Sequence, residues 1–383
     1  MYPIKKLQDC ATIIAGQSPE SKYYNSTGEG IPFFQGKADF GELYPKVRVY
    51  CSSPTKIAQY NDILLSVRAP VGPTNLSPGT VCIGRGLAAI RPDDSLDLKY
   101  LLYYFRYFET QLSAKGTGTT FKAINQKLIK NLEIPIPPLN EQSRVVAHIE
   151  ELFSELDKAV DTLKTTKEQL EVYRQTILVD AFRAATNSTY LKVGCVCAKI
   201  VDCPHSTPKW EKSGKLCLRT TNFKRGYLDL QSPNYVSEET FHDRNRRIIP
   251  QPGDVLYSRE GSVLGIACTI PSNVYPCLGQ RMMLLRSGEK LNNRYLMHYL
   301  NSPMVTNHVI ATKGGTGSPH INVGDIKEFQ IPIPSLEEQS SIVRQIEEQL
   351  SSCDNVEKTV DAILTQADAM RQSILKQAFE GTM

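Results

Sequence analysis

The residues with the clearest chemical potential lie in two glycine-rich runs, "KGTGTT" at 115–120 and "KGGTGS" at 313–318. Such runs can cradle phosphates, because bare backbone N–H groups can point at an anion. Neither run ends in the Gly-Lys-Ser/Thr sequence that a nucleotide-binding loop requires. Two interpretations stay open: contact with the phosphates of a polyanion, or a flexible connection ahead of the next strand.

Catalytic patterns are weak in this sequence. Asp93, Asp97 and Lys99 imitate the clustered carboxylates and lysine of a metal-dependent nuclease. The two acids lie too close together, and the second half of the chain offers only Glu289-Lys290, so an exposed turn is the better interpretation. The Asn-Pro-Pro-aromatic motif and the glycine-rich cofactor loop of an amino-methyltransferase are absent. We therefore predict no catalytic residue.

The cysteines could suggest a metal site, since Cys195, Cys197, Cys203 and Cys217 accompany His205. Their spacing lacks the paired C-x-x-C units of structural zinc, so we predict small buried thiols and no metal. The chain has ten cysteines and no secretion signal at its start, which favours the reducing cytoplasm. The sequence contains no run of about 18 apolar residues, so we predict no membrane span.

An internal repeat organises the whole chain. "IPIPPLNEQS" at 134–143 recurs as "IPIPSLEEQS" at 331–340, and the ungapped match continues through "RQTIL" at 174–178 and "RQSIL" at 371–375. The segments before each phrase match more loosely, as in "NDILLSVRAPVG" at 61–72 and "GDVLYSREGSVLG" at 253–265. Repeated segments of this length indicate one structural unit used twice.

The repeated element is predicted to be a long helix. No proline or glycine occurs between Leu139 and Phe182, and prolines fit just before a helix rather than inside it. Ser335 and Glu338 form a capping box at the start of the second copy. Each helix should be roughly 65 Å long at about 1.5 Å per residue.

Apolar residues recur in these helices at alternating intervals of four and three, the spacing of a coiled-coil seam. We expect the two helices to pack on each other within one chain, because joined segments have a high effective concentration. Pairing between two chains is the alternative. The predicted seam comprises Val145, Ile149, Leu152, Leu156, Leu163 and Leu170, and then Ile342, Ile346, Val356, Val360, Ile363 and Ile374.

Charge is divided unevenly between the helices and the rest. Residues 139–183 carry a net charge of −3 and residues 336–380 a net charge of −5, whereas the whole chain is +4. The remaining segments therefore carry +12, and their runs of β-branched and aromatic residues predict mixed α/β globules. Basic globules are typical of polyanion-binding proteins, although a solubilising surface would look similar.

The order of these features resembles the specificity subunits of type I restriction–modification systems. Two variable basic globules alternate with two near-identical helices, each of which follows I-P-I-P-x-L-x-E-Q and ends near R-Q-[TS]-I-L-x-x-A-F. The resemblance covers essentially the full chain. It implies an α+β protein with two similar target recognition domains, each reading one half of a bipartite, asymmetric site in double-stranded DNA. It also implies that the helices pack antiparallel, set the spacer and dock two methyltransferase subunits, and that motor-nuclease subunits can join. S-adenosylmethionine would belong to the methyltransferase partner, and this chain would have no cofactor.

The predicted domains are 1–133 and 191–330 for recognition, and 134–190 and 331–383 for the two conserved helical regions. Arginine and lysine suit guanine edges or phosphates, and glutamine suits adenine. The predicted DNA-contact residues are Gln35, Lys37, Arg68, Lys115, Thr117 and Lys122 in the first domain, and Arg219, Thr220, Arg259, Gln280, Arg281, Lys313 and His320 in the second. Two rival functions are a rod-and-globule adaptor that does not read DNA and a stand-alone DNA-cutting enzyme.

Overall fold

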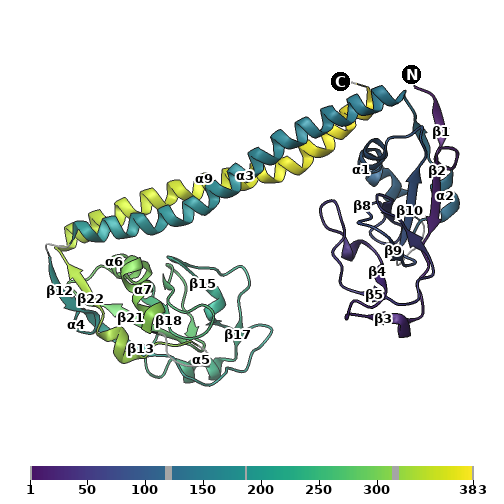
Figure 1. Ribbon diagram of the computed structural model, residues 1–383. Coiled ribbons are helices and arrows are strands. Elements are labelled where there is room, and N and C mark those ends of the chain that lie inside the picture. Colours follow the sequence, from purple (N-terminus) through teal and green to yellow (C-terminus); the bar gives the residue numbers. More distant parts are fainter. Residues whose placement is uncertain (1, 117–122, 186–187, 313–318, 382–383) are drawn as a thin grey trace. The chain divides into compact units, whose positions relative to one another are not determined.

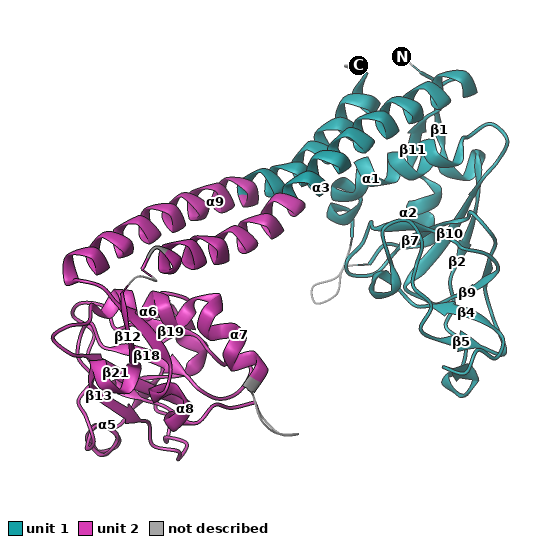
Figure 2. Ribbon diagram, turned by 60° about the vertical axis from the view of Figure 1, so that its left-hand side comes forward, with its two compact units in different colours: residues 1–163, 362–383 teal, residues 164–361 magenta. Residues whose placement is uncertain are grey.

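The computed structural model describes residues 2–116, 123–185, 188–312 and 319–381. They form two compact units, one of residues 1–163 and 362–383 and the other of residues 164–361 (Figure 2). Each unit therefore combines one globule with part of both long helices.

The globule of the first unit is built mainly from short strands. Its elements are β1 (Ile4–Lys6), β2 (Ala11–Ala15), β3 (Tyr24–Asn25), β4 (Ile31–Phe34), β5 (Tyr50–Cys51), β6 (Ile57–Ala58), β7 (Ile63–Ser66), β8 (Thr74–Leu76), β9 (Val81–Ile83), β10 (Leu87–Pro92), α1 (Leu98–Ala114), α2 (Gln126–Lys130) and β11 (Glu133–Pro135). One sheet has the order β2-β10-β7-β8, and a second has the order β3-β5-β4-β9-β6. In the second sheet β4 and β9 run parallel, so their carboxyl ends meet at one edge.

The second unit repeats this plan. Its globule contains β12 (Thr189–Lys192), α4 (Val193–Val196), β13 (Cys197–Asp202), β14 (Lys215–Leu218), β15 (Phe223–Lys224), β16 (Tyr227–Leu228), β17 (Tyr235–Val236), α5 (Glu238–Arg244), β18 (Val255–Ser258), β19 (Ala267–Thr269), β20 (Cys277–Leu278), β21 (Met282–Ser287), α6 (Asn293–Asn301), α7 (Pro303–Thr312), α8 (Val323–Lys327) and β22 (Gln330–Ile333). The sheet β13-β21-β18-β19 corresponds to β2-β10-β7-β8, and the parallel pair β14–β20 corresponds to β4–β9. The globules therefore share a fold, as expected.

The two long helices are α3 (Leu139–Ala184) and α9 (Leu336–Glu380), which run side by side (Figure 1). Their existence confirms the prediction from the proline-free and glycine-free stretches. In the second unit Lys167 pairs with Asp361 while Arg174 pairs with Asp354, so residue numbers rise along one helix as they fall along the other. The helices are therefore antiparallel.

The capping box predicted at the start of α9 is confirmed. The hydroxyl group and the backbone N–H of Ser335 donate to the Glu338 carboxylate over 2.8 and 2.9 Å, and the backbone N–H of Glu338 donates to the Ser335 hydroxyl. These bonds to its charged form lower the pKa of Glu338. The cap fixes where the second helix begins.

The predicted seam needs a correction in one of its two rows. Val356 and Ile363 are 44% and 42% exposed, and Val145, Leu152, Ile342 and Ile374 are only partly buried. The other row holds the contact, with Ile149, Leu156, Ile346, Cys353, Val360 and Ala367 buried and with Leu163 and Leu170 partly buried. The second buried row lies one residue later than expected, at Val146 and Phe153 of α3 and at Val343 of α9.

Charged residues continue that second row toward the carboxyl-terminal half of each helix. In the second unit Arg174 lies 2.6 Å from Asp354 and 2.9 Å from Glu357, and Lys167 lies 2.8 Å from Asp361. In the first unit Arg371, the repeat equivalent of Arg174, pairs with Asp157, the equivalent of Asp354. The same ion pair therefore occurs in both units, between the two helices.

The repeated Glu-Gln of the opening phrase joins helix to globule. Gln142 is fully buried; its amide oxygen accepts from the backbone N–H of Asp97 over 2.7 Å, and its amide nitrogen donates to the carbonyls of Ser95 and Pro137. Asp97 is the N-cap of α1, whose side chain accepts from Tyr100 N. Gln142 therefore fixes the start of α3 against the start of α1.

Gln339 makes the same three bonds in the second unit. It is also fully buried, accepts from the N–H of Asn292, the N-cap of α6, over 2.8 Å, and donates to Lys290 O and Pro334 O. The phrase is thus repeated because the same buried amide must join each helix to its globule.

The far end of each long helix packs on a globule as well. Phe379, near the end of α9, makes ring contacts with Tyr100, Tyr104 and Tyr107 of α1. Phe182, its equivalent near the end of α3, contacts Tyr295 and Tyr299 of α6. Within the described ranges, no helix combines the length and the apolar character needed to cross a bilayer.

Candidate nucleic-acid interface

The carboxyl ends of the parallel strands β4 and β9 form the candidate site of the first unit. Phe34 pairs with Ile83, so Gln35 and Arg85 follow the two strands at the same edge of the sheet. Both side chains are exposed. Gly86 passes close beneath them: a Cβ there would lie 2.2 Å from the Gln35 carbonyl oxygen, so only glycine fits.

Strand β7 ends at the same place and brings Arg68 to it. Val67 N–H donates to Gly86 O over 2.9 Å, and Ile124 N–H donates to Val67 O over 3.0 Å. The buried Ser66 hydroxyl donates to the carbonyls of Arg68 and Pro70, which shapes the turn after β7. The backbone therefore fixes Arg68 at the rim, next to the edge of β4 and β9.

These residues line a cleft of about 590 Å³. Its lining includes Gln35, Lys37, Arg48, Arg68 and Arg85. The one carboxylate among its described lining residues, Asp39, lies 2.5 Å from Arg48 and accepts from Gln35 N–H over 2.8 Å. Four cations and one carboxylate leave the cleft strongly positive, which suits phosphates and the acceptor atoms of guanine.

The second unit builds the corresponding edge from β14 and β20. Leu218 pairs with Leu278, so Arg219 and Gln280 follow the parallel strands as Gln35 and Arg85 do in the first unit. Arg219 is exposed and its guanidinium lies 5.4 Å from the Trp210 ring, a cation–π contact. Gln280 donates to His205 O over 2.6 Å. The predicted residues Arg219, Thr220, Gln280 and Arg281 therefore share one edge with the end of β18.

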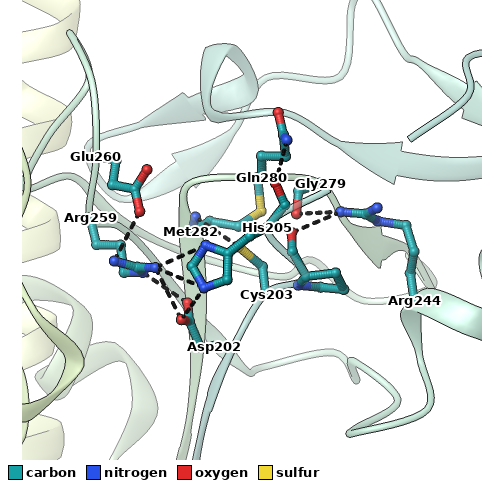
Figure 3. A network of polar contacts seen from close by, with 10 residues as sticks. Asp202, Cys203, His205, Arg244, Arg259, Glu260, Gly279, Gln280 and Met282 are labelled. Carbon is teal, nitrogen blue, oxygen red and sulfur yellow. Dashed lines mark hydrogen bonds and ion pairs between the residues drawn. The ribbon is translucent and has the colours of Figure 1, made fainter. Parts of the chain in front are cut away.

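Arg259 occupies a different environment from the one expected of a base-reading side chain. It is 8% exposed, and its guanidinium donates to both carboxylate oxygens of Asp202 over 2.8 and 3.0 Å (Figure 3). It also lies 3.0 Å from Glu260 and 3.4 Å from the ring nitrogens of His205. Arg259 thus holds the loops of the edge together, and direct DNA contact by this residue remains a prediction.

Arg244 stabilises the same edge from below. It is 5% exposed and donates to the carbonyls of Leu278 and Gly279, and to those of Pro204 and Ser206. These four bonds join the end of β20 to the loop after β13. Arg244 therefore contributes to the positive charge of the globule from a buried, supporting position.

The remaining predicted residues are less centrally placed. Lys115 ends α1, where its ammonium lies 5.2 Å from the Phe108 ring, and it is not among the lining residues of the cleft. His320 is exposed and forms a backbone bridge with Glu260, beside the second edge. Thr117, Lys122 and Lys313 lie outside the described residues. Asp202 and Glu260 were not among the predicted residues, and His205 was considered only as a metal ligand beside the cysteines. Asp202 lies 57 residues from its partner Arg259, so no local signal joined them.

The cysteines are mostly buried thiols, but Cys197 is only partly buried and Cys195 is exposed. Cys203 and Cys217 are fully buried, and burial raises the pKa of Cys203 and takes that of Cys197 to about 12. Cys195 is exposed, contrary to expectation, because it lies on the outer face of the short helix α4. Within the part of the chain that the structure describes, no three His, Cys, Asp or Glu side chains are grouped to hold a metal ion.

Comparison with known proteins decides the family. The model of the type I restriction modification DNA specificity domain matches residues 2–172 and 205–366, once over each globule with its helix. The chain belongs to this family. The resemblance inferred from the repeated motifs is therefore confirmed.

Named relatives agree with this assignment. The chain is 41% identical over 167 residues to a putative type I restriction enzyme MjaX specificity subunit of Methanocaldococcus jannaschii, a match that covers 43% of this chain and 38% of that protein. It is 23% identical over 329 residues to the EcoKI specificity subunit of Escherichia coli, covering 80% of this chain and 70% of that protein.

Solved structures share the fold. One similar chain comes from a structural study of the complex assembly and conformational transition of the type I R-M system. It aligns with a TM-score of 0.72 at 20% identity, covering 99% of this chain and 97% of that one. The HsdS subunit from Thermoanaerobacter tengcongensis aligns with a TM-score of 0.59 at 21% identity, covering 100% and 97%.

Proposed function

We propose that this chain is the DNA sequence-specificity subunit of a type I restriction–modification complex. The observation that carries the proposal is the repeated edge: in each unit, parallel strands and the end of a third strand present basic and amide side chains together. Each edge reads one half of a bipartite DNA site. Because the edges differ in their side chains, the two half-sites differ and the whole site is asymmetric.

The helices serve as spacer and docking platform. We propose conserved regions at 134–190 and 331–383, between and after recognition domains at 1–133 and 191–330. Tyr173 and Met370 occupy equivalent positions of the repeat and are 52% and 53% exposed, outside the seam. We propose that these two equivalent positions belong to the docking surfaces, and their repetition suits two copies of one partner, the methyltransferase subunit.

The chain acts without catalysis of its own in this proposal. Methyl transfer, with S-adenosylmethionine, belongs to the methyltransferase partners, and DNA cleavage belongs to motor-nuclease subunits that join the complex. The carboxylates first considered for a nuclease are engaged elsewhere: Asp97 caps α1, and Asp93 accepts from the N–H and hydroxyl groups of Ser95.

A genome-wide adenine-methylation map of a host that expresses this chain with its neighbouring methyltransferase tests the proposal. We expect a new split, asymmetric motif with one fixed gap. A palindromic motif or a variable gap would contradict the two-edge arrangement. No new motif, despite a stable complex with the methyltransferase, would favour the adaptor function instead.

A further inference from the structure

Two residues of opposite charge occupy the same backbone position in the two units. Val67 N–H donates to Gly86 O in the first unit, and Arg259 N–H donates to Arg281 O in the second, over 2.9 and 3.0 Å. The residue that follows each of them forms an isolated antiparallel bridge, Arg68 with Ala123 and Glu260 with His320. Arg68 and Glu260 are therefore structural equivalents.

In the first unit this position presents a hydrogen-bond donor. A guanidinium has five N–H donors and no acceptor. Arg68 is exposed at the cleft, and the described lining offers it no open carboxylate, because Asp39 is already held by Arg48 and by Gln35 N–H. Its donors point toward whatever occupies the cleft, and the excess positive charge favours an acceptor there.

In the second unit the same position presents an acceptor. The Glu260 side chain is 26% exposed and lies 3.0 Å from Arg259. Arg259 already donates twice to Asp202, so two carboxylates share one guanidinium. An ionised carboxylate has about four lone-pair sites, and the single contact with Arg259 leaves most of those on Glu260 open to a further donor.

The chemistry of DNA separates the two cases. A carboxylate is repelled by phosphates, so the DNA groups that suit it are the base amino donors, cytosine N4 and adenine N6. A guanidinium instead matches guanine O6 and N7. We propose that this shared position determines specificity in both units: Arg68 donates to a guanine in one half-site, and Glu260 accepts from the exocyclic amino group of a cytosine or adenine in the other.

This inference rests on the proposed function, and the test separates the two. The full chain, assembled with its methyltransferase, is mapped by genome-wide methylation as wild type, R68Q and E260A. We expect R68Q to reduce discrimination about tenfold at one base pair of one half-site, and E260A, which removes the acceptor, to do so at one base pair of the other. The remaining positions of the motif stay as in the wild type. The base that E260A ceases to prefer identifies cytosine or adenine.

Matched controls are K5Q and E289A, which change exposed charges of the same globules away from the edges. Both should leave the motif unchanged. If R68Q or E260A fails to assemble, R68K and E260D replace them: both keep the charge, lose the reach or the fork geometry, and should still change the same base pair.

The other possible results contradict either the proposed function or the specificity position. A wild-type complex without any motif contradicts the proposed function itself. A wild-type motif that R68Q and E260A leave unaltered, or weaken uniformly at all positions, contradicts only the specificity position. Changes by both variants in the same half-site would also overturn it.

Discussion

Gln142 and Gln339 each fix a long helix against its globule through a single buried side chain. An amide that is fully buried must satisfy both its donor and its acceptor, because an unsatisfied polar group costs about 1–3 kcal/mol. Both residues do so with the N-cap of a globular helix and with two carbonyls. Each therefore couples the direction of a long helix to the globule that it follows.

We predict that Q142A lowers the free energy of unfolding of the first unit by about 3 kcal/mol, because the N–H of Asp97 and two carbonyls lose their partner in the interior. Thermal or urea denaturation of the full chain measures the change. Q345A, at an exposed position of α9, is the matched control and should change stability by less than about 0.5 kcal/mol. Equal stability of Q142A and Q345A would show that the buried amide contributes nothing.

At the candidate edges, the sequence indicated residue types but not their surroundings. Gln35, Arg68, Arg219 and Gln280 were predicted as polar and basic loop residues, and the structure places them at the two edges, where β4 pairs with β9 and β14 with β20. Arg259 looked equally available. Its partner Asp202 precedes it by 57 residues and meets it only once β13, β21 and β18 form one sheet. Such a pair has no local sequence signal.

At the scale of the element, periodicity predicted the long helices but misplaced one row of their seam. Apolar residues stand side by side at 145–146 and 152–153, so either row fits the spacing. Further along, the true row contains Lys167 and Arg174, and a search for apolar positions passes over them. The structure accepts these charges because Glu357 meets both across the helix pair, at 3.5 and 2.9 Å.

We predict that L156D opens the helix pair in the first unit. Leu156 is 9% exposed, and the change removes apolar packing and places a charge against the partner helix, at a cost of about 4 kcal/mol. The measurements are circular dichroism during thermal unfolding and co-purification with the methyltransferase, both of which should decline. I363D is the informative control, since Ile363 was assigned to the same seam but is 42% exposed. I363D should lower the free energy of unfolding by less than about 1 kcal/mol. If I363D lost more stability than L156D, the seam row first predicted, which contains Ile363, would be the correct one.

At the scale of the whole molecule, charge is separated between the elements. The long helices carry −8 in total while the rest of the chain carries +12. Like charges on the helices repel a polyanion, so duplex DNA is directed to the globules, where the cleft of the first unit concentrates four cations. An adaptor that does not read DNA has no need of this separation.

Salt dependence of duplex binding tests that electrostatic division directly. The affinity of the assembled complex for DNA should fall linearly with the logarithm of salt concentration, because each neutralised phosphate releases counterions. R85Q removes an exposed cation of the cleft and should reduce the slope by about 0.9, the value for one phosphate contact. Fluorescence anisotropy over a series of salt concentrations measures the slope, with K5Q as a charge-matched control that leaves it unchanged.

If R85Q left the slope unchanged but relaxed the methylation motif, Arg85 would contact a base and not a phosphate. Wild-type binding without any salt dependence would contradict DNA recognition by the basic globules.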